Sequence, residues 1–413
     1  MSFYAYEFRA YPTPEQAQKI NQTIGCARKV YNLLLDDCQR QYKESGRFSV
    51  MNVGELKKRE DLQYLREVDS LALCNSYMHL KTAYTSFFRN FKKGKATPPK
   101  FKTKRDSKQS YCTNNISNSI RIEHEGLRLP KLGPIKCKFH RFVEGTIKSV
   151  TVKRTKTGKY FISILVDRKD KITERECDTD YENSVLGIDM SIPDFAVYSD
   201  NTKPKIMHYL RNSEKKLARA QKDLSRKQKD SRNWEKQRLK VARIHEKIAN
   251  QRKNFIEVES ARIAKEFEAV VVEDIDLRAM SKCLHFGKSI SDNGFGYFRT
   301  RLEAKLDAHL KDFVKADRWY PSSKTCHACG YVNKDLKLSD REWDCPSCGI
   351  HLDRDLNAAI NLKNYYIRMQ RTNLVEAGSV DDKLNSPKKH PVDKARKVVI
   401  TDEDPKSQAF CFS

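Results

Sequence analysis

Three acidic residues stand where the sequence predicts the end of a buried strand or the start of a helix. They are Asp189 within VLGIDM, Glu273 at the end of AVVVE, and Asp355 within DRDLNAA. Burying a carboxylate among branched apolar residues is costly unless a cation compensates, and three converging carboxylates need a metal. Two Mg²⁺ or Mn²⁺ ions bridged in this way would activate a water molecule and stabilise the leaving oxygen of a cleaved phosphodiester. A single acid at a strand end is more often a cap or a surface residue, so the indication of a nuclease depends on all three.

Four cysteines follow the pattern C-x2-C-x15-C-x2-C, namely Cys326, Cys329, Cys345 and Cys348. Two CxxC turns of this kind can each present two thiolates to one tetrahedral Zn²⁺. Because four protein ligands close the coordination sphere, we expect one structural zinc ion and not a catalytic one. His327 and His351 are alternative ligands that the sequence leaves open. The other eight cysteines are scattered singly, which is typical of a reducing compartment and not of a disulfide framework.

The composition indicates a soluble protein that binds a polyanion. Its 413 residues include 80 Lys and Arg against 54 Asp and Glu, a formal charge of +26. This excess is concentrated in defined segments, as in nucleic-acid-binding proteins. No stretch approaches the roughly 18 apolar residues of a membrane span, and the first residues lack the apolar region of a signal peptide. We expect a cytoplasmic protein that acts as a monomer and has no membrane partner.

The N-terminal part predicts a β domain with a helical insertion. The first ten residues alternate as a strand does, helical patterns run from Glu15 to about Phe91, and a Lys- and Pro-rich strip continues to Lys108. Residues 111–166 form short alternating stretches between glycine-bearing turns, which predicts an antiparallel barrel or sandwich. We expect the first strand to pair with these strands. The β domain would then comprise residues 1–11 and 109–180, and the insertion residues 12–108.

The C-terminal part predicts a second domain that holds the acids. Residues 185–200 predict two buried strands and residues 267–275 a third, while residues 211–254 predict a basic helical hairpin with a break near Asp230. A charge run on a helix is often only a solvated face, but beside a strand of nuclease type we interpret it as a groove for nucleic acid. Further expectations are a linker at residues 167–182, a mobile loop at 281–296, a helix at 297–313, a helix from near Asp353 to about Met369, and a disordered tail at 372–413.

Four segments together resemble one family. VLGIDMSIPDFAVYSD, VVVEDIDL, PSSKTCHACG and HLDRDLNAAINL are similar to the RuvC-type nuclease and zinc ribbon of TnpB, the insertion-sequence ancestor of compact type V CRISPR effectors. The N-terminal half of the chain, with YPTPEQ, the helical insertion and the PPKFK strip ahead of the β domain, is similar in the order of its segments to the N-terminal half of the family. The resemblance implies a multidomain α+β fold in which a β-barrel wedge domain with a helical insertion precedes a RuvC-like, ribonuclease-H-like α/β nuclease domain. The nuclease domain would comprise residues 181–320 and 351–371, with an inserted zinc ribbon at 321–350.

The resemblance also implies roles for individual residues. Asp189, Glu273 and Asp355 match the family's three metal-binding acids, and the four paired cysteines match its zinc ligands. Asp355 is chosen over Asp353 because it stands in the D-x-N-A-A position. Residues 211–254 match the basic hairpin that contacts guide RNA, and residues 281–296 match the lid that gates strand entry.

The implied activity is RNA-guided cleavage of double-stranded DNA beside a short flanking motif, by an enzyme that a transposable element encodes. The partners would be a guide RNA and the target duplex. Candidates for reading the motif are Asn75, Ser76, Tyr77, Thr113 and Asn114, whereas Lys100 and Lys102 would hold phosphates. Two alternatives remain open, namely a ribonuclease-H-like transposase or nuclease that needs no guide, and an RNA-guided repressor that binds without cutting.

Overall fold

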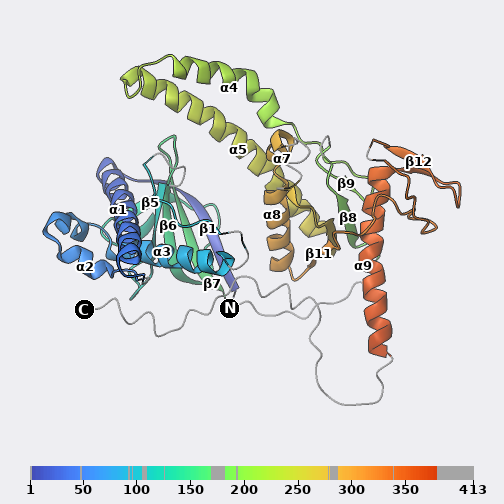
Figure 1. The fold of residues 1–413 in the computed structure, drawn as a ribbon, viewed down its shortest axis with the longest axis horizontal. Helices are drawn as coiled ribbons and strands as arrows, with labels where there is room; N and C mark the ends of the chain where they lie inside the picture. The colour runs from blue at the N-terminus through green and yellow to red at the C-terminus, as the bar shows by residue number, and fades with distance from the viewer. Residues whose placement is uncertain are drawn as a thin grey trace. The chain divides into compact units, whose positions relative to one another are not determined.

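The computed structural model describes residues 2–168 and 182–378, except residues 47–48, 92–93, 95, 105–108, 125, 192–193, 278, 280–286 and 338. The chain forms two compact units that divide after residue 173 (Figure 1). Unit 1 denotes the described residues up to 168, and unit 2 denotes those from 182 onward. Each unit mixes helices and strands.

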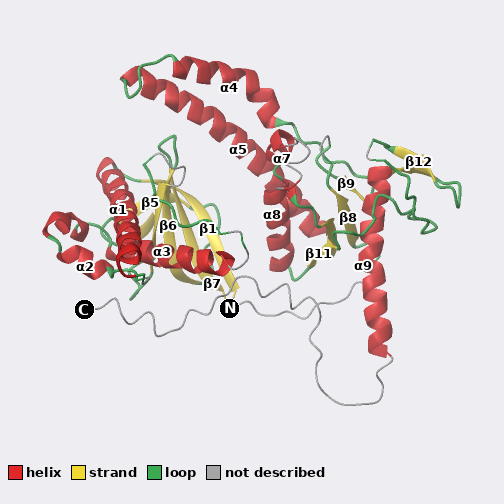
Figure 2. Cartoon of the chain, viewed as in Figure 1, coloured by secondary structure: helices red, strands yellow, loops and turns green. Residues whose placement is uncertain are grey.

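Unit 1 is built on one curled sheet of seven strands in the order β2-β6-β7-β1-β5-β4-β3 (Figure 2). Neighbouring strands are antiparallel. Because these strands belong to a single sheet, the sandwich of two sheets that the sequence left open is wrong. The strands are β1 (Ser2–Tyr11), β2 (Gln109–Asn114), β3 (Arg121–Glu123), β4 (Gly126–Leu129), β5 (Gly133–Lys138), β6 (Thr146–Arg154) and β7 (Tyr160–Arg168).

The first strand, β1, lies in the middle of this sheet. It pairs along its length with β7 and at its end with β5. Its alternate residues Tyr6, Phe8 and Ala10 are buried in the core of the sheet, as expected for a strand with one face toward the core. The predicted pairing of the first strand is confirmed, and the helices between β1 and β2 therefore interrupt one sheet.

The helices of unit 1 are α1 (Pro14–Ser45), α2 (Val53–Lys58), the 3₁₀ helix η1 (Glu60–Arg66) and α3 (Ser70–Phe91). Thr13 caps α1, since its hydroxyl accepts the backbone N–H of Gln16 while the Gln16 side chain accepts the backbone N–H of Thr13. This reciprocal pair satisfies two donors at the helix start. The helices share a core of their own, which includes Leu34, Leu73 and Leu80.

Unit 2 contains a four-stranded sheet in the order β11-β10-β8-β9. β10 (Ala269–Glu273) pairs in parallel with both β11 (Asp312–Ala316) and β8 (Val185–Asp189), whereas β9 (Val197–Tyr198) is antiparallel to β8. Leu186 and Val270 pack with residues of α5 (Arg232–Glu266) and α8 (Phe295–Ala308) on one face, and Val185 and Val271 pack with α9 (Arg354–Gly378) on the other. Burial on both faces explains the continuous apolar runs of these strands.

The predicted basic hairpin is confirmed as α4 (Tyr209–Ser225) and α5. The two helices lie side by side (Figure 1). The turn between them contains Asp230 with a positive φ of 65°, a conformation that Asp tolerates better than most residues. α5 continues to Glu266, twelve residues beyond the predicted end at Asn254.

The predicted mobile loop at 281–296 is wrong where the structure describes it, because residues 287–293 form helix α7 (Gly287–Asn293). The reason is a long-range contact that local composition does not reveal. The buried carboxylate of Asp292 accepts the backbone N–H groups of Leu210 and Arg211 and forms an ion pair with Arg252. Asp292 thus satisfies donors at the start of α4. Residues 281–286 of the predicted loop lie outside the described residues.

The predicted helix 297–313 is wrong at its end, because Phe313 belongs to strand β11. α8 ends at Ala308, and Leu310 adopts a positive φ of 56°. The chain then turns back and pairs with β10 from Ala269 to Glu273. Pairing with a distant strand therefore overrides the local helical pattern.

The remaining elements are the short hairpin β12 (Glu342–Asp344) and β13 (His351–Asp353) and the long helix α9. α9 extends to Gly378, seven residues into the segment 372–413 predicted as a disordered tail. In the predicted linker 167–182, Asp167 and Arg168 belong to β7. Residues 169–181 and 379–413 lie outside the described residues. Among the helices of the described residues, none combines the length and apolar character needed to cross a membrane.

Candidate active site

Two of the predicted acids end neighbouring parallel strands. Asp189 is the last residue of β8 and Glu273 the last residue of β10. The register pairs Ile188 with Val272, so the next residues of the two strands, Asp189 and Glu273, follow at the same edge of the sheet. Strands in a sheet lie about 4.8 Å apart. Parallel pairing therefore brings two carboxylates together at the edge where open α/β sheets commonly bind ligands.

The third acid, Asp355, lies in the first turn of α9, which packs directly on β8. The close approach occurs at Gly187, where a Cβ atom would lie 2.0 Å from the carbonyl oxygen of Ala359. No side chain larger than hydrogen fits such a contact. Gly187 thus allows the start of α9 to deliver Asp355 to the strand ends.

The three acids interact electrostatically. Burial, together with the negative charges of Asp355 and Glu273, raises the pKa of Asp189 to about 8. Burial also raises the pKa of Glu273, an effect that the Arg354 guanidinium opposes. Like charges held together in such a site disfavour ionisation unless a cation joins them. Carboxylate oxygens are the ligands that Mg²⁺ and Mn²⁺ prefer, so the donor set fits the predicted metal site.

Asp353 and Asp355 are distinguished by their contacts. One oxygen of Asp353 accepts the backbone N–H groups of Asp355 and Leu356, at 2.9 and 3.0 Å, and thereby caps α9. Its other oxygen lies 3.3 Å from Nζ of Lys203. Although burial opposes the shift, the backbone bond from Leu356 and the Lys203 ammonium lower the pKa of Asp353. Asp355 instead forms an ion pair with Arg341 at 3.1 Å, and its negative charge helps to raise the pKa of Asp189.

The four paired cysteines form a cluster whose sulfur atoms all lie within 4.8 Å of one another. Sγ of Cys326 is 3.7 Å from Sγ of Cys348, and Sγ of Cys329 is 3.5 Å from Sγ of Cys345. These distances exceed a disulfide bond of about 2.05 Å. They are close to the roughly 3.8 Å between sulfurs that each bind one tetrahedral zinc at about 2.3 Å.

The two CxxC turns have the same backbone geometry. In each, the glycine after the second cysteine, Gly330 or Gly349, has a positive φ and donates its N–H to the carbonyl of the first cysteine. The backbone N–H of Tyr331 lowers the pKa of the exposed Cys329 thiol to about 6. The backbone N–H of Ile350 opposes a rise in the pKa of the Cys348 thiol to about 12, which burial and the neighbouring thiols cause. The turns therefore suit a soft metal ion through their matching geometry.

Two asparagines of α9 attach this cluster to the helix, and sequence reasoning missed both. Asn357 accepts the backbone N–H of His327 at 3.0 Å and donates to the carbonyl of Thr325 at 2.7 Å. Asn361 donates to the carbonyls of Ser322 and Thr325. Both side chains are buried. Their spacing of four residues, which puts them on one helix face, is the sequence signal that would have identified them.

The two histidines considered as alternative zinc ligands contact other residues. Nδ1 of His327 lies 3.0 Å from Oδ1 of Asn357, and Nδ1 of His351 lies 2.8 Å from Oδ1 of Asp344. Among the described residues, the group within ligand distance consists of the four cysteines alone.

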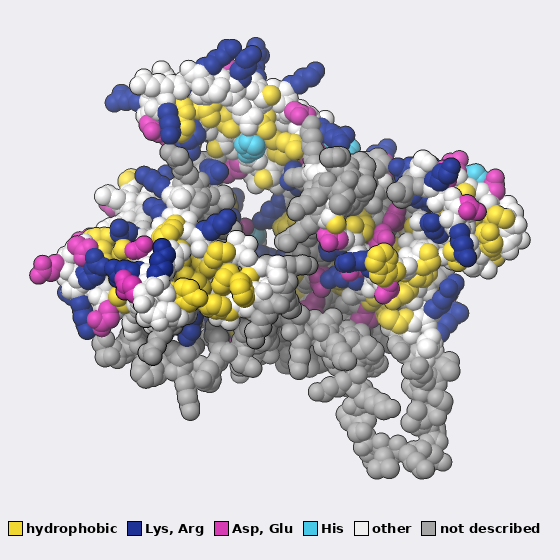
Figure 3. Space-filling view, viewed as in Figure 1, with side chains coloured by type: hydrophobic (Ala, Val, Ile, Leu, Met, Phe, Trp, Pro, Cys, Tyr) yellow, Lys and Arg dark blue, Asp and Glu magenta, His cyan; other side chains and the backbone are white. Residues whose placement is uncertain are grey.

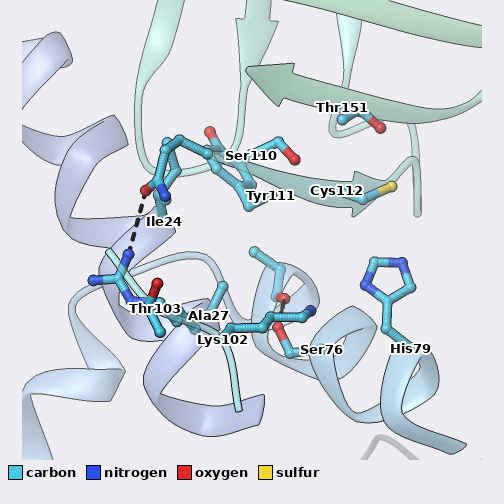
Figure 4. A pocket seen from close by; sticks show the side chains of 13 residues that line it. Ile24, Ala27, Ser76, His79, Lys102, Thr103, Ser110, Tyr111, Cys112 and Thr151 are labelled. Atoms are coloured by element: carbon cyan, nitrogen blue, oxygen red, sulfur yellow. Dashed lines mark hydrogen bonds between the residues drawn. The ribbon is translucent and has the colours of Figure 1, made fainter. Parts of the chain in front are cut away.

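The residues predicted to read DNA lie on α3 and β2. Other residues of these two elements line a cavity of about 710 Å³ in unit 1 (Figure 4), and of the five predicted residues only Ser76 is part of its lining. Asn75 donates to the carbonyl of Cys112 at 2.9 Å and to Oδ1 of Asn114 at 3.4 Å. Ser76 lines the cavity but is buried, and its hydroxyl donates to the carbonyl of Ala72. Thr113 is fully buried. Asn75 and Asn114 thus contact one another, and both keep exposed surface.

The remaining predicted contacts differ in exposure. Tyr77 packs against the core of the unit 1 helices. Lys100 and Lys102 are exposed, and Nζ of Lys102 lies 3.7 Å from the centre of the Tyr31 ring. His79 and Lys102 both point into the cavity (Figure 4).

Comparisons with known families match three parts of the chain. Residues 165–284 match a family described as "Probable transposase" of the OrfB_IS605 type. Residues 295–362 match the Cas12f1-like TNB domain, and residues 3–47 match a helix-turn-helix domain of the OrfB_IS605 type. These segments include Asp189, Glu273, Asp355 and all four clustered cysteines.

Individual relatives extend over most of the chain. A protein of Streptomyces pristinaespiralis named "Putative RNA-guided DNA endonuclease" is 36% identical and the match covers 87% of this chain and 88% of that protein. InsQ of Escherichia coli (strain K12), which carries the same designation, is 30% identical over 87% of this chain and 91% of its own. The protein in a cryo-EM structure of a Cas12f1-sgRNA-target DNA complex shares the fold, with a TM-score of 0.51, 15% identity, and coverage of 85% of this chain and 83% of that one.

An identity of 36% over 87% of this chain and 88% of the relative establishes common descent, and the family matches cover the segments in which the sequence motifs occur. The chain belongs to the TnpB family of RNA-guided DNA endonucleases.

Proposed function

We propose that this protein is an RNA-guided endonuclease that cleaves double-stranded DNA beside a short flanking motif by metal-ion-dependent hydrolysis. The observation that carries the proposal is the position of Asp189 and Glu273 at neighbouring strand ends, with Asp355 in the first turn of the helix that packs on β8. The charges of Asp355 and Glu273 act on Asp189, whose pKa is raised to about 8 mainly by burial. The names of its relatives supply the guide and the substrate class. A nuclease domain of ribonuclease-H type fits the sheet of unit 2, in which the antiparallel pair β8–β9 adjoins parallel β10 and β11.

Asp189, Glu273 and Asp355 would hold Mg²⁺ or Mn²⁺. Bound ions of this kind supply a hydroxide-like water and neutralise charge on the phosphate. The chain's own contribution is to fix the carboxylates, Asp189 and Glu273 through parallel pairing and Asp355 through the packing of α9 at Gly187. The capped start of α9 holds Asp355 in the first turn.

The cysteine cluster would hold one structural Zn²⁺ and so form a zinc ribbon. Its sulfur separations of 3.5 and 3.7 Å support this, as do the two matching turns. The ion would stabilise the segment that Asn357 and Asn361 attach to α9. Its role is therefore to support the helix that carries Asp355.

The basic hairpin α4–α5 would contact guide RNA. Residues 211–254 contain sixteen Lys and Arg against five Asp and Glu, and dark blue side chains gather over α4 in Figure 3. Phosphate contacts of this kind position a nucleic acid without reading its sequence. In unit 1, Asn75 and Asn114 would approach the flanking motif, with Lys100 and Lys102 at phosphates.

The test uses full-length protein expressed with the transcript that flanks its own gene. Cleavage of duplex DNA should require Mg²⁺ and should move to a new target when the guide portion is rewritten. Asp189→Ala should abolish cleavage while leaving RNA and target binding near normal. Cleavage that ignores the guide would instead establish a guide-independent nuclease, and binding without cleavage would establish a repressor.

Asp355→Asn and Asp353→Asn form a matched pair for the third acid. Asp355→Asn should abolish cleavage with little loss of stability. Asp353→Asn retains a capping amide and should keep most activity, while Asp353→Ala should cost about 0.5–2 kcal/mol of stability as the loss of an N-cap does. Loss of cleavage in Asp353→Asn but not in Asp355→Asn would reverse the assignment.

A further inference from the structure

Trp319 is an exposed tryptophan in unit 2, with 85% of its surface accessible. A single exposed apolar side chain needs no explanation by itself, so the position of this one decides whether it has a role. The chain has three tryptophans. Trp343 is buried and Trp234 is half-buried, so Trp319 is the most exposed of them.

Trp319 lies at the same edge of the sheet as the acids. It follows β11, and the register pairs Ala316 of β11 with Glu273 of β10. β11 is the neighbour of β10, which is the neighbour of β8, so the ends of β11 and β8 are about 10 Å apart at a strand spacing of about 4.8 Å. A nucleic-acid strand across Asp189 and Glu273 would pass within a few nucleotides of this turn.

The turn that carries Trp319 is fixed by its neighbours. The backbone N–H of Trp319 donates to Oδ1 of Asp317 at 2.8 Å. Arg318 forms an ion pair with Asp274, the residue after Glu273, at 3.3 Å. Tyr320 packs edge-on against Tyr365 of α9, and its hydroxyl donates to the carbonyl of Asn361.

These anchors involve residues on either side of the indole and not the indole itself. Trp319 is therefore held outward from a rigid turn that is joined both to the strand of Glu273 and to the helix of Asp355. Little backbone conformational entropy would be lost when its ring contacts a partner, which favours binding.

We propose that Trp319 stacks on a base of the single-stranded DNA that occupies the cleavage site. This inference rests on the proposed function, in which guide pairing opens the duplex and leaves unpaired DNA. Aromatic side chains beside cationic groups bind single strands by stacking, without regard to sequence, because every base has a π-face. The half-exposed guanidinium of Arg318 is the adjacent cation. Trp319 thus sets the path of the strand beside the three carboxylates.

Intrinsic fluorescence tests the contact without cleavage. Full-length protein in Mg²⁺-free buffer should show quenching of tryptophan emission when oligothymidylate is added. Trp319→Phe should lose most of this quenching, because the two remaining tryptophans are buried or half-buried. Phe142→Ala, which removes an equally exposed aromatic ring of unit 1 at 86% exposure, should keep it. Equal quenching in wild type and Trp319→Phe would overturn the inference.

Steady-state cleavage supplies the second measurement. Trp319→Ala should raise KM for target DNA about tenfold, equivalent to about 1.4 kcal/mol, while Trp319→Phe should restore most of the loss because it keeps a ring. An unchanged KM in an active Trp319→Ala protein would overturn the inference but leave the proposed function intact. A wild-type protein that cleaves no DNA would overturn the proposed function, whereas the quenching would still test Trp319.

Discussion

Asp189 is a carboxylate whose burial destabilises its ionised form and whose position suits it to bind a metal ion. It ends a strand that is buried on both faces, and the negative charges of two further acids act on it. With a pKa of about 8, it would hold its proton at neutral pH in the absence of a cation. Binding of a divalent ion removes that proton because the ligand must be ionised. Asp189 is therefore suited to bind a metal ion, whose positive charge would favour its ionised form.

The raised pKa of Asp189 should make the stability of the metal-free protein depend on pH. The folded state retains the Asp189 proton between the ordinary pKa of 3.8 and the raised value of about 8. Since the unfolded state releases it over that range, the free energy of unfolding falls as pH rises from about 4 to about 8. Asp189→Asn removes this dependence. Its melting temperature should exceed that of wild type, and the difference should grow as the pH rises to about 8. Each kcal/mol of difference in the free energy of unfolding shifts the melting temperature by about 2–4 °C.

Thermal unfolding in buffer without Mg²⁺ and without chelator measures this effect and leaves any zinc in place. A difference between the two proteins that stays constant from about pH 5 to about pH 8 would contradict the raised pKa. Addition of Mg²⁺ should stabilise wild type and not Asp189→Asn, because a ligand that binds only the folded state stabilises it.

At the level of residues, the sequence predicted the acids and cysteines because each belongs to a short motif. The motif also favoured Asp355 over Asp353, but only the structure gives Asp353 its own role as the cap of α9. Asn357 and Asn361 were missed, although they lie in the same motif, because the four-residue spacing that puts them on one helix face does not reveal their partner carbonyls. Trp319 was missed because exposure cannot be inferred for one aromatic residue in a turn.

At the level of elements, strands and helices with strong apolar patterns were predicted, and those that depend on distant partners were not. β8 and β10 are continuous apolar runs, and the hairpin α4–α5 has apolar residues at helical spacing. β11 has the mixed sequence DFVKA and is a strand because β10 pairs with it. α7 has few apolar residues and is held by the buried Asp292, which contacts the start of α4 more than eighty residues earlier in the chain.

The packing of α9 on β8 can be tested at Gly187. Gly187→Ala would force a Cβ atom to within 2.0 Å of the Ala359 carbonyl, so the helix must move and Asp355 with it. We expect a loss of stability of about 1–3 kcal/mol, typical of overpacking, and a loss of cleavage greater than that of stability. Cleavage assays with thermal unfolding measure both.

Gly25 provides the matched control, because it lies in α1 and a Cβ atom added there would meet nothing within 4 Å. Gly25→Ala should stabilise the protein by about 0.5–1 kcal/mol, since alanine favours the helix more than glycine does. Full activity and stability in Gly187→Ala would show that α9 does not approach β8 as closely as described.

At the level of the whole molecule, two units with separate cores share one chain. The sequence predicted this division because the alternating patterns of residues 111–166 differ from the apolar runs after residue 185. The sequence did not reveal how the sheet edge that carries the acids is connected to the cysteine cluster. That connection runs through Asn357 and Asn361, which join the cluster to the helix that carries Asp355.

Removal of zinc should therefore affect more than the cluster. Elemental analysis should find about one zinc per chain, falling toward zero in Cys345→Ser. This variant should also bind Mg²⁺ more weakly than wild type, because the segment that supports α9 loses its fixed form. Cys112→Ser, a half-buried cysteine of unit 1, should retain both metals. A zinc-free wild type with normal folding would contradict the proposed ribbon.

The central position of β1 has a consequence for how the protein is made. Ser2 pairs with Arg168, so the first strand emerges from the ribosome long before its partner exists. At about 5–20 residues per second, the delay is roughly 10 to 30 s. During that time the edge of β1 that β7 covers has unpaired N–H and C=O groups, which invite aberrant pairing. Nascent chains of this protein should therefore depend on a chaperone that binds the exposed strand until β7 has been synthesised.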